Sequence, residues 1–286
     1  MLRIVKSVNI LDVTQRSVPL YFNNCKIGYC LFEVYDLIRH KHMDKFIQKA
    51  DGIEVMKTEY LQQLLDEWRS DNKFNCLRGW RNEKYPINTK SEHVGDLERS
   101  GCGLFGIRTY GVHINGYTTR NGEIFMWIAK RSITKQTWPG YLDQLCAGGI
   151  PSGQSRMNAV IRECEEEASI PREISKNAIP VGLISYFLES DIGLCPETQY
   201  CYDLHVAESF TPIPNDGEVE SFQLLDLDLI YQLIIEDKFK PNCAVVVIDF
   251  MVRHGYLNPD KEPHYEELVE SIRRPLSAEL PPPINS

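Results

Sequence analysis

A glycine-rich loop that runs directly into an acidic helix constrains this chain more than any other feature. Residues 148–170 read GGIPSGQSRMNAVIRECEEEASI. The glycines and the proline at the start are unsuited to a helix interior, so they predict a tight loop, called here the glycine loop (residues 148–154). Ser155 is a suitable N-cap, and apolar residues then recur at helical spacing: Met157, Val160, Ile161, Cys164 and Ala168. The segment therefore predicts a loop that leads into an amphipathic helix.

Three glutamates share a second face of this predicted helix. At about 100° per residue, Glu163, Glu166 and Glu167 lie together and away from the apolar stripe. Carboxylates this close repel each other and raise each other's pKa unless a cation joins them. Oxygen ligands of this kind suit Mg²⁺ or Mn²⁺. A run of glutamates is more often a solvated helix face, and it is the glycine loop in front of it that favours a metal site.

The spacing across loop and helix resembles the signature of the Nudix hydrolases, G-x5-E-x7-R-E-U-x-E-E-x-G-U, where U is a bulky apolar residue. Gly148 is followed after five residues by Gln154 and after seven more by the Arg162-Glu163 pair. Gln154 stands in place of the first glutamate of the pattern, and Ser169 in place of its last glycine. Cys164 is a small apolar substitute. The Arg-Glu and Glu-Glu pairs, which lie nearest the chemistry, are intact.

The resemblance covers nearly the whole chain up to about residue 255. Outside the helix it rests on residues 79–83, 111–117, 130–132, 137–140, 199–204 and 216–220. These segments are similar to the thiamine-pyrophosphokinase-related Nudix proteins, which carry an extra N-terminal domain called DUF4743. The resemblance implies an α/β fold: a Nudix α/β/α sandwich with a mixed sheet, preceded by a smaller α+β N-terminal domain. The implied domains are 1–107 (DUF4743-like), 108–258 (Nudix) and 259–286 (a C-terminal helix and proline-rich tail).

For the reaction, the resemblance implies a hydrolase acting on phosphoric anhydride bonds, a diphosphatase that releases a monophosphate and phosphate. It suggests oxidised analogues of thiamine diphosphate, or oxidised guanine nucleoside diphosphates such as 8-oxo-dGDP, as substrates in a housecleaning role. Because a diphosphate is itself anionic, divalent cations must bridge it to the acidic helix. We expect Glu163, Glu166 and Glu167 to bind Mg²⁺ (or Mn²⁺), with the carbonyl of Ala147 or Gly148 as a further ligand.

Three residues are candidates for catalytic roles. Glu163 is also the candidate proton acceptor, and Arg162, one turn before Glu166, is expected to orient the carboxylates through hydrogen bonds. Glu218 lies in an acidic segment, 216–220, where it either completes a metal shell or serves as a turn residue. Gln154 accepts a hydrogen bond but carries no charge, which affects the number of metal ions or the rate and not the fold.

Four further residues are candidates for substrate binding. Arg131 and Lys135 follow a predicted hairpin and could reach a diphosphate, although cations at strand ends are more often solvated. Trp80 and Arg81 offer a stacking ring and a cation in a loop-like cluster. A packed Trp with solvated charges beside it is the other interpretation.

Sequence periodicity also predicts the secondary structure around the site. Helical spacing indicates helices at residues 33–40, 58–70, 227–235, 242–253 and 264–273, and an amphipathic helix within the first eighteen residues. Alternation indicates strands at residues 26–32, 110–118, 124–129, 181–188, 199–205 and 221–225. Asn121-Gly122 predicts a hairpin turn, and residues 191–198 a polar loop.

Composition narrows the class of protein. The 286 residues, 43% hydrophobic and 25% charged, can bury a sizeable core and are not typical of disorder. A net charge of −9 predicts no attraction to nucleic acid polymers or anionic membranes. Nine cysteines without a C-x-x-C pair favour free thiols in a reducing compartment. We therefore expect a cytoplasmic monomer or homodimer whose partner is a small-molecule diphosphate.

Two other functions remain open. Isopentenyl diphosphate isomerases resemble the chain at residues 135–140, but Ala147 occupies the position of their catalytic Cys and Gly149 that of their metal-binding His. A catalytically weak binding module on a Nudix scaffold is suggested by Gln154 and Ser169. Metal-dependent release of phosphate from a diphosphate is expected of a hydrolase and of neither alternative.

Overall fold

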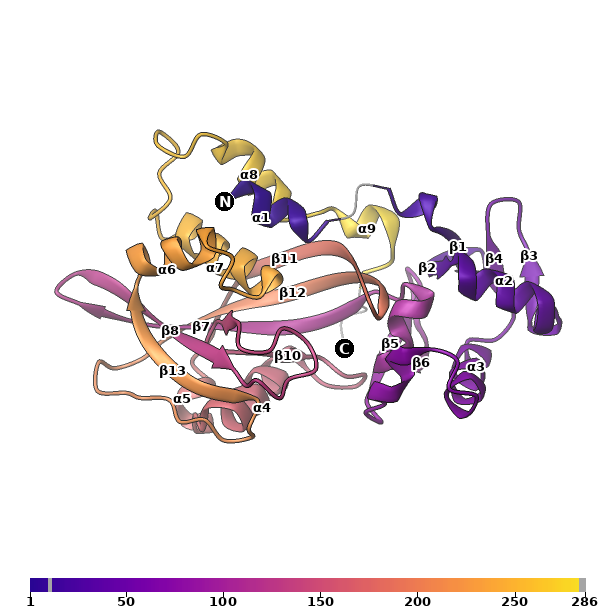
Figure 1. Ribbon diagram of the computed structural model, residues 1–286, viewed down its shortest axis with the longest axis horizontal. Helices are drawn as coiled ribbons and strands as arrows, with labels where there is room; N and C mark the ends of the chain where they lie inside the picture. Colours follow the sequence, from indigo (N-terminus) through magenta and orange to yellow (C-terminus); the bar gives the residue numbers. More distant parts are fainter. Residues whose placement is uncertain (10–11, 283–286) are drawn as a thin grey trace.

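A mixed sheet of seven strands forms the centre of the larger part of the molecule (Figure 1). The structure, a computed structural model, describes residues 1–9 and 12–282. The strands are β7 (Thr109–Arg120), β8 (Glu123–Arg131), β9 (Leu142–Asp143), β10 (Cys146–Gly149), β11 (Ile179–Ser190), β12 (Gly193–His205) and β13 (Val219–Asp226). Five of them run in the order β11-β12-β7-β8-β13, while β10 pairs with β7 and β9 with β8. Only β12 and β7 are parallel among these pairs of described strands, so the sheet is mixed, as the sequence predicts.

The hairpin between β7 and β8 turns at the predicted dipeptide. Asn121 and Gly122 both have positive φ, 52° and 85°. A two-residue turn of this kind matches the right-handed twist of the flanking strands, and Asn-Gly adopts it at little conformational cost. The pair Arg120–Glu123 closes the ladder directly beside the turn.

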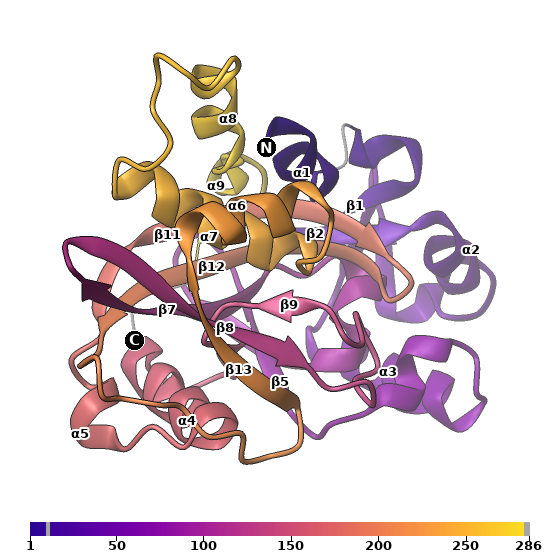
Figure 2. The same ribbon diagram turned by 60° about the vertical axis from the view of Figure 1, so that its left-hand side comes forward.

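Helices cover both faces of this sheet (Figure 2). On one face lie α4 (Arg156–Ala168) and the short α5 (Arg172–Ser175), and on the other α6 (Leu227–Ile235) and α7 (Pro241–Arg253). Two separate apolar cores result, one between sheet and α4 and one between sheet and α7. The predicted α/β/α sandwich is therefore confirmed. The helix α1 (Leu2–Ser7) and the helix α8 (Tyr265–Ser271) join the core on the α7 side, although residues 1–107 were expected to form a separate domain.

The N-terminal part of the molecule is a smaller α+β unit with its own core. Its strands are β1 (Ser17–Phe22), β2 (Cys25–Leu31), β3 (Phe46–Gln48) and β4 (Ile53–Val55), in the order β2-β1-β4-β3, followed by the hairpin β5 (Lys84–Asn88) and β6 (His93–Glu98). Its helices are α2 (Phe32–Lys41) and α3 (Glu59–Ser70), and a 3-10 helix spans Arg99–Phe105. The predicted apolar face of α3 is buried: Leu61, Leu64, Leu65 and Trp68.

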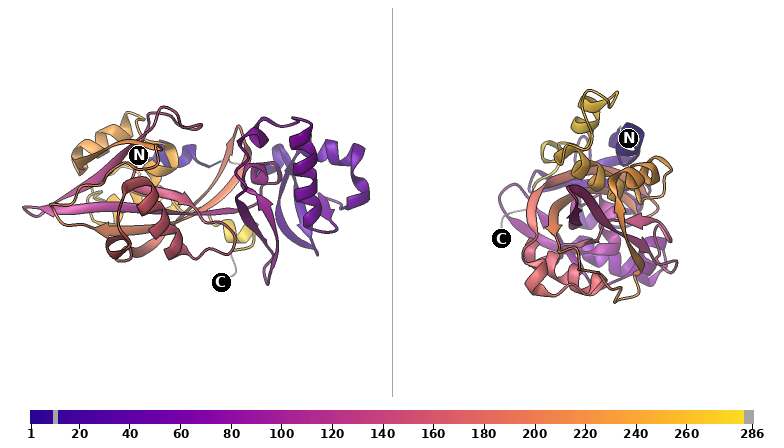
Figure 3. Two further views of the ribbon diagram at one scale, coloured as in Figure 1. Left: turned by 90° about the horizontal axis from the view of Figure 1, so that it is seen from below. Right: turned by 90° about the vertical axis from the view of Figure 1, so that its left-hand side faces the viewer.

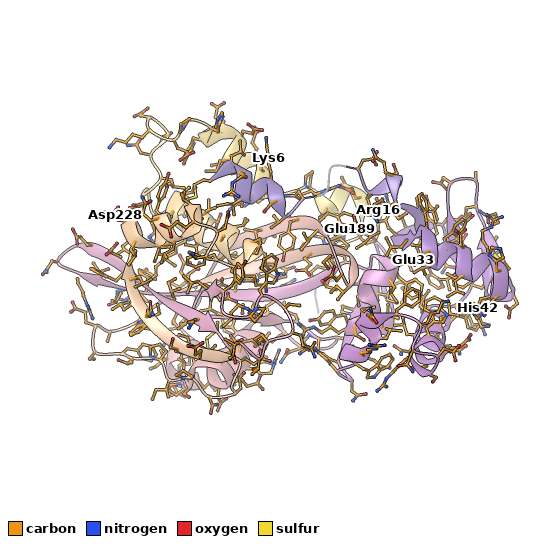
Figure 4. All side chains as sticks on the ribbon, viewed as in Figure 1. Lys6, Arg16, Glu33, His42, Glu189 and Asp228 are labelled. Atoms are coloured by element: carbon orange, nitrogen blue, oxygen red, sulfur yellow. The ribbon has the colours of Figure 1, made fainter. Side chains whose placement is uncertain are left out.

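The two parts lie side by side and share contacts (Figure 3). A small apolar cluster joins them: Val13, Tyr29, Phe187, Leu194, Leu276 and Leu280. The last two come from α9 (Leu276–Glu279) and the residue after it, so the C-terminal segment helps to connect the parts. Near this cluster, Arg16 and Glu189 meet in an ion pair of 2.7 Å (Figure 4).

The amphipathic helix expected within the first eighteen residues is α1, which ends at Ser7, and β1 begins at Ser17. One sequence-based expectation differs from the structure. Residues 191–198 are not a polar loop, because β12 begins at Gly193 and pairs continuously with β11. Pro196 is tolerated there because β12 gains β7 as a second neighbour only from Glu197 onward. At the proline, one side of the strand therefore has no partner strand that needs a backbone N–H.

No helix among the described residues is long and apolar enough to cross a membrane.

Candidate active site

The acidic helix α4 forms as its sequence predicts and packs its apolar stripe on the sheet. The Ser155 hydroxyl accepts a hydrogen bond from the Asn158 backbone N–H, 3.3 Å away, and so caps the first turn. Three residues of the predicted stripe join the core between the helix and the sheet: Val160, Cys164 and Ala168. Ile161 is buried as well. The helix ends at Ser169, which adopts the left-handed conformation with φ 52°. This conformation explains why the family pattern has glycine there.

Replacing Ser169 with glycine is expected to stabilise the protein by about 1 kcal/mol, because a left-handed backbone is unfavourable for a residue with a Cβ. For a chain of this size the melting temperature should rise by about 2–4 °C. Thermal unfolding followed by circular dichroism measures the shift. Ser155→Gly is the matched control, since Ser155 has φ −73° and its side chain caps the helix. An equal gain in both variants, or none in Ser169→Gly, would contradict the assignment.

Glu163 lies buried against the glycine loop. Its carboxylate occupies the space beside Gly148, where an added Cβ would overlap the carboxylate atoms. Burial raises the pKa of Glu163 to about 7; the charge of Arg162 opposes this rise, and the charge of Glu166 adds to it. A carboxyl group with a pKa near neutrality can accept a proton and release it again. A side chain at position 148 would therefore displace the Glu163 carboxylate from its place beside the loop.

Glu167 lies one turn after Glu163 and is also buried. One carboxylate oxygen, Oε2, accepts a hydrogen bond of 3.0 Å from the backbone N–H of Ala147. This bond ties the helix to β10, the strand that carries the predicted carbonyl ligands. Burial and the neighbouring Glu163 raise the pKa of Glu167 well above its usual value. The two carboxylates therefore form a buried acidic pair.

Arg162 connects the acidic helix to the loop. Its guanidinium donates to Glu166 at 3.1 Å and to the carbonyl of Gly149 at 3.0 Å, and it lies 2.7 Å from a Glu163 oxygen. A fourth contact, 3.4 Å long, joins it to the side-chain oxygen of Gln154. Arg162 thus contacts two carboxylates of α4 at once. Gln154 touches the site through this arginine.

Gln154→Glu is expected to lower the Mg²⁺ concentration at half-maximal rate several-fold. A carboxylate at this position adds negative charge beside the three glutamates and strengthens cation binding. The rate of diphosphate hydrolysis is measured over a range of Mg²⁺ concentrations, and the concentration at half-maximal rate is compared between variants. Gln63→Glu, which adds the same charge on the exposed face of α3, serves as the control and should leave the titration unchanged. An unchanged titration in Gln154→Glu would place residue 154 outside the metal shell.

Glu218 and Lys135 meet at the rim of the site. The Lys135 ammonium donates to the Glu218 carboxylate. Burial alone would raise the pKa of Glu218, but the hydrogen bond and charge of Lys135 outweigh it and lower that pKa. The charge of Glu218 also adds to the raised pKa of Glu163, so the two carboxylates lie within electrostatic reach of each other. Both rim residues were predicted, and here they neutralise one another.

The remaining candidates lie at different distances from the acidic pair. Arg131 is buried and donates to Asp143 and to the carbonyls of Thr137 and Trp138, so it holds the loop after β8. Trp80 packs on the N-terminal core, and the Arg69 guanidinium lies 4.4 Å from its ring centroid. Arg81 is exposed, and its charge helps to lower the pKa of Glu218. The structure thus brings Arg81 toward the rim and gives Arg131 and Trp80 structural contacts.

The oxygen donors fit a divalent cation in chemical type. Within residues 1–9 and 12–282, no three His, Cys, Asp or Glu side chains are already grouped closely enough to hold a metal ion. Arg162 is paired with both Glu163 and Glu166. A buried acidic pair with raised pKa values is nevertheless the environment that a divalent cation stabilises. The residues that would hold it are Glu163, Glu166 and Glu167, with a carbonyl of the glycine loop.

Two residues at the site were not found by sequence reasoning. Tyr85 of β5 lies against Gly149, where an added Cβ would overlap its hydroxyl. The charge of Arg99, at the end of the same hairpin, reaches Glu163 and lowers its pKa against the effect of burial. Both residues precede the glycine loop by more than forty positions in the chain, and no motif marks them.

Comparisons with known proteins agree with this geometry. Residues 5–109 match the family model DUF4743, a domain of unknown function, and residues 109–243 match the NUDIX domain. An uncharacterized protein of Saccharomyces cerevisiae is 36% identical over 258 residues, which are 85% of this chain and 75% of the yeast protein. Nudix hydrolase 20, chloroplastic, of Arabidopsis thaliana is 43% identical over 69% of this chain and 53% of its own length. Nudix hydrolase 24, chloroplastic, of the same plant is 39% identical over 69% of this chain and 54% of its own. The matched segments thus span about half the length of the plant relatives.

Proposed function

Because this chain belongs to the Nudix hydrolase family, whose members act on phosphoric anhydride bonds with divalent metal ions, we propose that it hydrolyses an organic diphosphate to the monophosphate and phosphate. One observation carries the proposal. Glu163 and Glu167 form a buried acidic pair on α4, and the glycine loop packs directly on it. Mg²⁺ is the cation proposed, with Mn²⁺ as a substitute.

The proposed substrates are damaged diphosphates: oxidised analogues of thiamine diphosphate or oxidised guanine nucleosides such as 8-oxo-dGDP. Support comes from the resemblance of the sequence to the thiamine-pyrophosphokinase-related branch. The DUF4743 and NUDIX matches agree with the two-domain arrangement of that branch. A diphosphate group binds metal ions in the same way whatever is attached to it. Discrimination therefore comes from contacts with the remote, aromatic part of the substrate.

Each residue of the site has a distinct part in the proposed reaction. When bound, the cation offsets the charge of the diphosphate oxygens and stabilises the leaving phosphate. Glu163, with a pKa of about 7, accepts the proton of the attacking water. Arg162 fixes the carboxylates of Glu163 and Glu166 through the contacts described above. Glu167 is held in place by the Ala147 N–H.

A catalytically weak binding module is the second candidate, and Gln154 is the observation that favours it. This residue contacts Arg162 with a neutral amide where the family pattern has a carboxylate. The isomerase alternative is disfavoured by the chemistry of the loop. Ala147 and Gly149 occupy the positions at which that reaction requires Cys and His, and burial raises the pKa of the nearby Cys146 well above its usual value.

A substrate panel tests the proposal. Phosphate release is measured with Mg²⁺ for thiamine diphosphate, its oxo and oxy analogues, dGDP, 8-oxo-dGDP and isopentenyl diphosphate. We expect hydrolysis with a higher kcat/KM for the oxidised compounds than for their parents. Equal kcat/KM for oxidised and parent compounds would contradict the substrate proposal. Binding of the diphosphates without phosphate release would support the binding module.

A further inference from the structure

The N-terminal hairpin β5–β6 reaches the glycine loop of the catalytic part. The carbonyl of Lys84 on β5 accepts a hydrogen bond of 2.8 Å from the backbone N–H of Ser152 in that loop. On its other side the loop is fixed by the Ile150 N–H, which donates to the carbonyl of Tyr110 on β7 at 2.9 Å. The glycine loop therefore lies between a strand of the NUDIX sheet and a strand of the DUF4743 segment. A side chain of β5 that faces the glycine loop therefore lies close to the candidate active site.

Tyr85 is such a side chain. It is 4% exposed, its ring belongs to the N-terminal core, and its hydroxyl lies against the Cα of Gly149. Within the described part of the chain this hydroxyl has no hydrogen-bond partner. The hydroxyl is therefore available to donate to an anionic ligand that approaches the glycine loop.

Arg99 stands next to Tyr85. Its guanidinium carbon lies 5.6 Å from the centroid of the Tyr85 ring, and its Nη1 donates to Glu83 at 2.7 Å. The other guanidinium nitrogens make no hydrogen bond to any described residue, and the side chain is 38% exposed. The guanidinium field also lowers the pKa of Glu163, which places the cation within electrostatic reach of the acidic pair. Arg99 thus has donors available on the side of the site opposite α4.

Two other cations near the acidic pair are already engaged. Arg162 is shared among Glu163, Glu166 and the Gly149 carbonyl, and Lys135 is paired with Glu218. A diphosphate that enters this acidic site needs positive partners besides the metal ion. Guanidinium groups and phenolic hydroxyls are suitable donors to phosphate oxygens, and the guanidinium bond is charge-assisted.

We infer that Tyr85 and Arg99 of the DUF4743 domain bind the phosphate oxygens of the substrate, so that the active site is completed by both domains. This inference rests on the proposed function and adds substrate-binding residues to it. Arg99 donates its free nitrogens to the diphosphate while Nη1 stays on Glu83, and the Tyr85 hydroxyl donates beside the Gly149 backbone. The N-terminal domain thereby acts as one wall of the active site.

The test separates ligand binding from a structural role by using the Arg99–Glu83 pair. Arg99→Ala is expected to raise KM for the best diphosphate of the panel about tenfold or more, since a hydrogen bond to a charged group is worth roughly 1.5–3 kcal/mol. Its kcat should change much less. Arg99→Lys keeps the charge and should recover part of the loss. Tyr85→Phe removes only the hydroxyl and should raise KM by a smaller factor.

Glu83→Gln is the matched control. It removes the same ion pair but leaves the Arg99 guanidinium in place, so KM should stay the same or fall. If Arg99 serves only to fold the hairpin, Glu83→Gln and Arg99→Ala will raise KM alike and lower the melting temperature alike. That outcome would overturn the inference.

A binding measurement without turnover gives a second readout. Imidodiphosphate, which carries a P–N–P link that resists hydrolysis, is titrated into each variant with Mg²⁺ and followed by calorimetry. The expected result is weaker binding in Arg99→Ala and Tyr85→Phe and unchanged binding in Glu83→Gln. If the wild type hydrolyses diphosphates while both variants bind and turn over like it, this inference alone fails. A wild-type protein that neither binds imidodiphosphate nor hydrolyses any diphosphate overturns the proposed function and this inference together.

Discussion

Glu167→Gln is expected to lower the kcat for diphosphate hydrolysis about a thousandfold while the protein stays folded. The change removes the charge of a buried carboxylate that would bind the cation, and it keeps an oxygen that can accept the Ala147 hydrogen bond. Loss of roughly 4 kcal/mol of transition-state stabilisation corresponds to this factor. The melting temperature of the metal-free protein should stay the same or rise, because repulsion between Glu163 and Glu167 is relieved.

Glu165→Gln provides the control for this result. Glu165 is exposed on the same helix, so this variant makes the same Glu-to-Gln substitution outside the acidic pair. Steady-state rates at saturating substrate and Mg²⁺ should be close to wild type. Full activity in Glu167→Gln, or an equal loss in both variants, would show that the buried pair is not the metal site.

Gly148→Ala is expected to lower the rate about a hundredfold, because displacing a reacting group by about 1 Å is enough for such a loss. An added Cβ would overlap the Glu163 carboxylate, and the flexible side chain would have to move away from the loop. The backbone at residue 148 is not in the left-handed region, so alanine introduces no φ strain there. The fold should therefore survive, and the loss should appear in kcat.

Gly79→Ala is the corresponding control in the N-terminal part. A Cβ at position 79 would meet the side-chain oxygen of Gln136 at 3.4 Å, an ordinary contact. Circular dichroism and melting temperature establish that both variants fold. Unchanged kcat in folded Gly148→Ala would mean that the position of the Glu163 carboxylate does not matter for the reaction.

Much of the catalytic part could be predicted because its signals are local. The N-cap Ser155 and the apolar stripe of α4 belong to one continuous segment, and so do the three glutamates. The hairpin turn at Asn121-Gly122 depends on two residues whose positive φ is easily adopted. For the same reason the helices α6 and α7 were found within one residue of their observed bounds.

The features that sequence could not provide depend on contacts between distant segments. A proline in a polar segment predicts a loop, as at Pro196. Its place in a strand is possible only because β12 pairs with β11 there and does not pair with β7 until Glu197. Arg131 is a basic residue at a strand end, and its burial depends on Asp143. Tyr85 and Arg99 acquire their place only because β5 pairs its backbone with the glycine loop. In each case the deciding partner is a residue that no local pattern connects to it.

The central claim is that this chain hydrolyses diphosphates with a cation held by the buried acidic pair. Its most direct test is a metal add-back experiment on the best compound of the substrate panel. The protein is stripped with a chelator, and phosphate release is measured before and after Mg²⁺ is returned, for the wild type and Glu167→Gln. The account predicts no release by the stripped protein, full recovery in the wild type and almost none in the variant. Full activity after stripping, or equal recovery in both proteins, would contradict it.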